Sequence, residues 1–96
     1  MRFSFCFKIK TPVNGSDKIN VLKQEGLRAN SLDDCISYLG NEYMNAKHPL
    51  LKFQKMDWFI YDFEKSSCYT GSFKIEENKS FLELVSDKID LSQFKK

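Results

Sequence analysis

Glycine is scarce in this sequence, and its four glycines stand far apart at positions 15, 26, 40 and 71. Both the P-loop and the dinucleotide-binding fingerprint need several glycines within one short loop, so neither motif can be built. Histidine is scarcer still, because His48 is the only one. A catalytic cysteine needs a histidine that activates it and a third group that orients this histidine. With one histidine in the sequence, such a catalytic site is not expected. We predict that the protein is not an enzyme and that it binds no cofactor.

The three cysteines, Cys6, Cys35 and Cys68, do not form a framework. An odd number of cysteines without a C-x-x-C pair argues against both a disulfide scaffold and a zinc site, so we expect no metal. Cys35 falls on the apolar stripe of an expected helix, where a thiol is an inert core residue. Reduced thiols are typical of the cytoplasm, or of the host cytoplasm if a phage encodes the chain. The excess of lysine over arginine, thirteen to two, is a bias found in AT-rich bacterial and viral genes.

Long apolar runs are also missing, and none approaches the ~20 residues of a membrane-spanning helix. What is abundant is aromatic: nine Phe, four Tyr and one Trp make up 15% of the chain. Large rings supply much of the burial energy of cores and of interfaces. With 96 residues, two cores would each be too small to be stable, so we predict one domain that spans residues 1–96.

The first half of the chain predicts a β-hairpin. Residues 2–11 alternate strictly, with Phe3, Phe5, Phe7 and Ile9 on one face, as in a half-buried strand. Pro12 and the dipeptide Asn14-Gly15 then indicate the end of the strand and a tight turn. Residues 18–28 fit either a returning strand or a short helix, and we favour the strand because the turn requires one.

The remaining elements follow from caps and alternation. Ser31 can cap a helix over residues 31–46, which ends before Pro49. Residues 56–64 and 68–76 predict two further strands, and the spacing of Ser80 and Glu83 predicts the capping box of a short C-terminal helix. The order β-β-α-β-β-α favours an α+β fold: an antiparallel sheet of about four strands, with one main helix and a short C-terminal helix packed on it.

Residues 56–64 are apolar on both faces. Phe59, Tyr61 and Phe63 share one face, and Trp58 and Ile60 share the other, whereas a strand covered on one side alternates apolar with polar. Two interpretations stay open. Either helices cover both faces, or one face is open and binds a partner through Trp58, the residue type most enriched at binding hot spots.

Asp62 and Glu64 lie on one face of the same segment. Two carboxylates on one face could act as an acid–base pair or hold a divalent cation. We favour a solvated strand end, because no loop of the sequence supplies further oxygen ligands.

The leading functional hypothesis is a small non-enzymatic module that binds another protein, for example as a stoichiometric inhibitor that acts by occlusion. Its basis is an excess of aromatic residues without catalytic motifs. Aromatic side chains would anchor the contact, and a basic loop over residues 47–55 would orient it by charge. The residues assigned to this partner site are Trp58, Ile60, Tyr69, Lys47, Lys52, Phe53 and Lys55.

Three alternatives remain. Arg2, Lys8, Lys10 and the basic loop could bind a nucleic acid, although two arginines are few for phosphate and base contacts. A pocket between sheet and helix could sequester a small ligand. An open sheet face or edge could instead be covered by a second copy in a homodimer.

Overall fold

The computed structural model describes residues 1–12, 18–47, 54–76 and 79–85. Its elements are β1 (Phe3–Pro12), β2 (Ile19–Ala29), α1 (Leu32–Ala46), β3 (Lys55–Asp62), β4 (Ser67–Lys74) and α2 (Phe81–Val85). The four strands form one antiparallel sheet in the order β2-β1-β3-β4. The predicted α+β fold is therefore confirmed. The predicted turn at Asn14-Gly15 lies outside the described residues.

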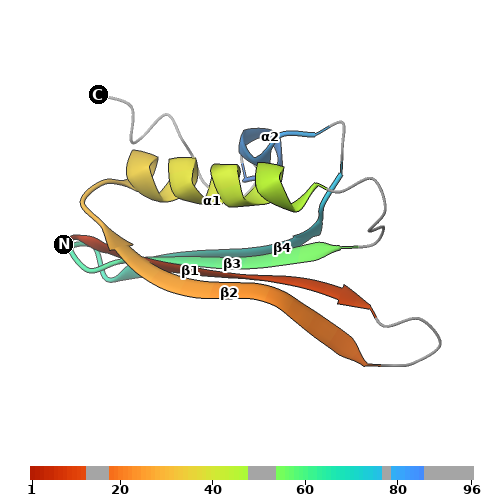
Figure 1. Ribbon diagram of the computed structural model, residues 1–96. Coiled ribbons are helices and arrows are strands. Elements are labelled where there is room, and N and C mark those ends of the chain that lie inside the picture. Colours follow the sequence, from red (N-terminus) through yellow and green to blue (C-terminus); the bar gives the residue numbers. More distant parts are fainter. Residues whose placement is uncertain (13–17, 48–53, 77–78, 86–96) are drawn as a thin grey trace.

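Both helices lie on the same face of the sheet, so the described chain forms two layers (Figure 1). None of the described helices covers the opposite face. Neither described helix has the length and apolar character of a membrane-spanning segment.

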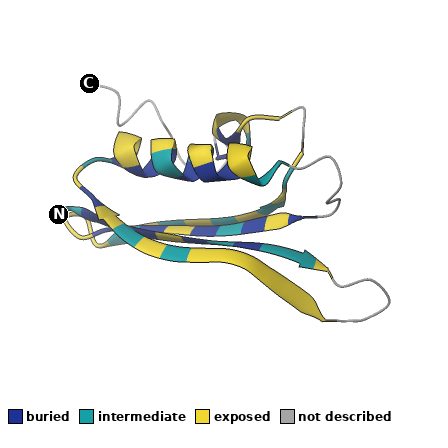
Figure 2. Ribbon diagram, in the orientation of Figure 1, coloured by how far each residue is buried: buried dark blue, intermediate teal, exposed yellow. Residues whose placement is uncertain are grey.

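The alternation of β1 decides which face is covered. Phe3, Phe5, Phe7 and Ile9 are all buried beneath the helical layer, while the residues between them are partly or fully exposed. Figure 2 shows this alternation along the sheet. Because β1 lies between β2 and β3, its rings form the middle of the core.

Residues 18–28 form a strand, as the turn chemistry predicted. β2 pairs with β1 along its whole length, with an irregularity between Ile9 and Lys10. Ile9 faces Lys23 and Lys10 faces Val21, so Leu22 is the extra residue of a β-bulge.

The two helices begin where the caps predict. The side chain of Ser31 accepts a hydrogen bond from the backbone N–H of Asp34 at 3.1 Å, and Ser80 does the same for Glu83 at 3.2 Å. The Tyr43 hydroxyl then links α1 to the chain after β4, because it donates to the carbonyl of Glu76 and accepts from its N–H. The buried stripe of α1 comprises Leu32, Cys35, Ile36, Leu39, Glu42 and Tyr43.

Candidate functional site: the open face of the sheet

Trp58 and Ile60 belong to the core. Their exposed fractions are 2% and 0%, and the Trp58 ring packs edge-on against Phe81 of α2, with 6.1 Å between ring centroids. The prediction that these two residues stand on an open face is wrong. The physical reason is the register: Trp58 pairs with Phe7 of β1 and Ile60 with Phe5, so their side chains share the covered face.

The other residues of the predicted partner site do not form one surface. Tyr69 is partly buried against the core, on the helical side of the sheet. Lys47 also lies on the helical side, where its Nζ donates to the carbonyl of Lys79 at 2.9 Å and stands 5.1 Å from the ring centroid of Tyr43. Lys55 lies on the opposite face. Lys52 and Phe53 lie outside the described residues.

The face without a described helix carries a row of three rings. Phe59, Tyr61 and Phe63 follow one another along and just beyond β3, and we refer to them as the aromatic strip. Neighbouring ring centroids lie 6.5 Å and 5.0 Å apart. Phe59 and Phe63 keep 37% and 49% of their surface exposed. Of the two interpretations of this strand, one open face is therefore supported, but it is the face opposite to Trp58.

Cations lie on the same face as the aromatic strip, three of them in a row at the end where β3 begins. Cross-strand pairing places Lys10 opposite Lys55, and Lys55 opposite Lys74, while Arg28 and Tyr61 both pair with Ser4. The guanidinium of Arg28 lies 5.7 Å from the ring centroid of Phe63. The cations of the open face among the described strands are Lys8, Lys10, Arg28, Lys55 and Lys74.

Asp57 is the one carboxylate among the described strand residues of this face. It lies 2.7 Å from Nζ of Lys10, and the hydroxyl of Ser72 also donates to it. Partial burial alone would raise the pKa of Asp57, but the hydrogen bonds from Lys10 and Ser72 outweigh it and lower that pKa. Asp57 is therefore ionised at neutral pH and compensates one of the five cations.

The helical layer has the opposite balance. Its described cations are Arg2, Lys23, Lys47 and Lys79, and ion pairs join Arg2 to Asp62, Lys23 to Glu42 and Glu25, and Lys79 to Glu76. The described carboxylates on this side are Glu25, Asp33, Asp34, Glu42, Asp62, Glu76 and Glu83. Positive charge is thus concentrated on the open sheet face, and negative charge on the helical side.

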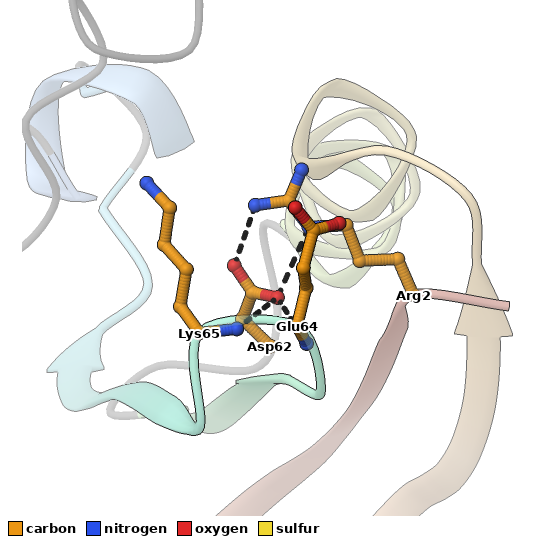
Figure 3. Close-up of polar contacts among 4 residues, drawn as sticks. All are labelled: Arg2, Asp62, Glu64 and Lys65. Carbon is orange, nitrogen blue, oxygen red and sulfur yellow. Dashed lines mark hydrogen bonds and ion pairs between the residues drawn. The ribbon is translucent and has the colours of Figure 1, made fainter.

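Asp62 and Glu64 do come together, but around an arginine (Figure 3). The Asp62 side chain is fully buried and accepts from Nε and Nη2 of Arg2 at 3.0 and 2.9 Å, whereas Glu64 lies 3.4 Å from Nε. The backbone N–H groups of Glu64 and Lys65 also donate to Asp62. The prediction of a solvated strand end is therefore wrong for Asp62.

This arrangement suits a structural ion pair. The hydrogen bonds from Arg2 lower the pKa of Asp62, with smaller contributions from the two N–H groups, and together they exceed the opposing effect of burial. A carboxylate held in its charged form is a poor proton donor at neutral pH. Arg2 precedes β1 and Asp62 ends β3, so the pair fastens these two strands together.

The cysteines divide between core and open face. Cys35 is fully buried in α1, and burial raises the pKa of its thiol to about 11. Cys6 and Cys68 are exposed on the open face, beside Phe59 and Tyr61 respectively. Within the described ranges, no three His, Cys, Asp or Glu side chains are grouped so that they could hold a metal ion.

Comparison of the chain with models of protein families, with curated proteins and with solved structures gives no match. The chemistry of the open face is therefore the basis for a functional proposal.

Proposed function

We propose that this protein is a non-enzymatic binding module whose open sheet face binds single-stranded nucleic acid. The observation that carries the proposal is the aromatic strip, three rings in a row along a central strand, on a face whose described strands also carry five cations and one carboxylate. Aromatic side chains stack on unpaired bases, and lysine and arginine side chains neutralise the phosphates that connect them.

Two features favour a single strand over a duplex. In a double helix the base faces are occupied by neighbouring base pairs, so exposed rings such as Phe59 and Phe63 have nothing to stack on. The cations also lie on both sides of the strip, on β1 and β2 as well as on β4, where they can follow a flexible backbone across the sheet.

The balance of charge favours nucleic acid over the protein partner suggested by the sequence. Lysine is depleted at protein–protein interfaces, whereas four lysines lie on this face. Two of the aromatic and aliphatic anchors assigned to a protein partner, Trp58 and Ile60, are buried. An acidic protein surface remains the competing outcome of the experiment below.

The test is a titration of a fluorescent oligothymidine and its RNA counterpart, followed by anisotropy at several salt concentrations. Each phosphate contact on a single strand contributes about −0.7 to the slope of log K against log salt, so the five cations allow a slope of up to about −3.5. Phe59→Ala or Phe63→Ala should weaken binding by about fivefold to a hundredfold, because one stacked base is worth about 1–3 kcal/mol.

The matched control is Met44→Ala, which removes an exposed apolar side chain from the helical layer and should leave affinity unchanged. Absence of binding in dilute salt, or binding that ignores salt, would contradict the proposal. Capture of an acidic peptide in place of the oligonucleotides, with loss in Phe59→Ala, would assign the face to a protein partner.

A further inference from the structure

A groove lies at the end of the open face where β3 begins. Its volume is about 360 Å³, and the described residues that line it are Lys10, Thr11, Pro12, Ile19, Lys55 and Lys74. Lys55 is the first residue of β3, whereas Phe63 follows its last, so this lysine groove and the far end of the aromatic strip lie at opposite ends of one face. Phe59 follows Lys55 by four positions, so the two residues lie about 13 Å apart along the strand.

The three lysines of the groove are direct cross-strand neighbours. Lys10 pairs with Lys55, and Lys55 pairs with Lys74, so one row across β1, β3 and β4 consists of like charges. Such a row destabilises a sheet when nothing compensates it. Among the described residues Lys10 has Asp57 as a partner, and neither Lys55 nor Lys74 forms an ion pair.

The balance of charge in the groove selects the kind of ligand. Among its described residues, three lysines and the Asp57 carboxylate leave an excess of two positive charges. A phosphodiester within a strand carries one negative charge, whereas a terminal phosphate monoester carries about −1.5 to −2 at neutral pH and offers three acceptor oxygens. A dianion with several acceptors therefore matches the lysine groove better than a phosphate in the middle of a strand.

We propose that the lysine groove binds the terminal phosphate of a strand whose bases stack on the aromatic strip, an inference that rests on the function proposed above. The Lys10, Lys55 and Lys74 ammonium groups donate to the phosphate oxygens, and Pro12 and Ile19 form apolar walls nearer the hairpin end. The structure thus assigns an end preference to the open face.

The experiment compares one oligothymidine of about ten nucleotides in three forms: 5′-phosphorylated, 3′-phosphorylated and without a terminal phosphate. Affinities are measured by competition in the anisotropy assay at about pH 7.5, where the monoester is a dianion. One of the two phosphorylated forms should bind about tenfold more tightly than the form without phosphate, as expected for charge-assisted hydrogen bonds.

The double variant Lys55→Gln/Lys74→Gln should abolish this difference. The matched control is Lys8→Gln/Arg28→Gln, which removes two cations of the same face outside the groove. It should weaken all three oligonucleotides equally and preserve their ratio. Because replacing Lys55 relieves repulsion between neighbours, the double variant should melt at the wild-type temperature or above it.

The outcomes separate this inference from the proposed function. Equal affinity for all three forms, or a ratio unchanged in Lys55→Gln/Lys74→Gln, overturns the end preference and leaves single-strand binding intact. A separate calorimetric titration with inorganic pyrophosphate tests whether the groove binds a free phosphate compound. If pyrophosphate binds in a manner that needs Lys55 and Lys74 while no oligonucleotide binds, a free phosphate compound is the source, and both the terminal-phosphate assignment and the proposed function are wrong.

Discussion

The indole ring of Trp58 lies directly against Gly71, its cross-strand neighbour in β4. A Cβ atom at position 71 would stand 2.8 Å from Nε1 of Trp58 and 2.9 Å from two of its ring carbons. Real Cβ atoms do not approach other atoms so closely, so the glycine makes room for the largest buried ring of the core.

Gly71→Ala should therefore destabilise the protein by about 1–3 kcal/mol, the usual cost of overpacking. Chemical denaturation in urea measures this change. Gly26→Ala is the matched control, because a Cβ there would meet only the Cβ of Cys6, at an ordinary 3.9 Å, and should change stability by less than about 0.5 kcal/mol. Equal effects at both glycines would show that the Trp58 ring does not occupy this position.

Neighbouring residues of β3 should respond in opposite ways to truncation. Trp58→Ala removes a buried ring and should cost about 3–5 kcal/mol of unfolding free energy. Phe59→Ala removes a ring from the open face and should cost far less, while it weakens oligonucleotide binding. Thermal unfolding of the two variants tests the difference in stability, and anisotropy tests the difference in binding. A Trp58→Ala protein as stable as wild type would contradict the core position of Trp58.

The Arg2–Asp62 pair predicts loss of stability in acid. The folded-state pKa of Asp62 is lowered below its ordinary value of 3.8, so its stabilising contribution is complete above about pH 4 and disappears as pH falls through the lowered folded value. Wild type should exceed Asp62→Asn by on the order of 2 kcal/mol at neutral pH, and the gap should close in acid. Denaturation curves at neutral and acidic pH measure the gap.

Glu64→Gln provides the control for this pair. Glu64 lies 3.4 Å from Arg2, but its side chain is 69% exposed, so its contribution is screened by solvent and should be small. A gap between wild type and Asp62→Asn that stays constant with pH would contradict the assignment.

Ser66, in the turn between β3 and β4, offers a route to higher stability. Its φ angle of 51° lies in the left-handed region, which a residue with a Cβ adopts at a cost of about 1–2 kcal/mol. Ser66→Gly should raise the unfolding free energy by about 0.5–1 kcal/mol after the loss of chain entropy is counted. Ser66→Ala keeps the Cβ, so it should give no such gain in the same urea titration.

The thiols should fall into two classes. Cys6 and Cys68 are exposed, whereas Cys35 is buried and the pKa of its thiol is raised to about 11. A disulfide reagent should therefore titrate two thiols quickly in the native protein and the third only when it unfolds. A bulky maleimide on Cys6, beside Phe59, should also block oligonucleotide binding, and the Cys6→Ser/Cys68→Ser protein should keep its affinity in the presence of the reagent.

The helices and strands could be predicted from the sequence because each is marked by a pattern of nearby residues. Strict alternation at Phe3–Ile9, the cap at Ser31 and the Ser80–Glu83 spacing each act within a few residues, and each was confirmed. The choice of a strand for residues 18–28 rested on turn chemistry and was also correct.

The open face could not be predicted, because β3 is ambiguous by itself. One of its faces runs Lys55, Asp57, Phe59, Tyr61, and the other runs Met56, Trp58, Ile60, Asp62, so each combines large apolar residues with charge at one end. A shift of one residue in the pairing with β1 would exchange the two faces. The small Gly71 opposite the large Trp58 indicates that Trp58 faces the core. This pairing can be used only when the register of β3 and β4 is known.

The separation of charge between the two layers has a consequence for how the protein meets a polyanion. Carboxylates on the helices are repelled and lysines on the sheet are attracted, so the molecule experiences a torque while the two are still apart. Encounters should begin with the open sheet face turned toward the polyanion. Association should be fastest at low ionic strength, where these charges are screened least. If the open face binds single-stranded nucleic acid as proposed, this torque orients the protein before any ring contacts a base.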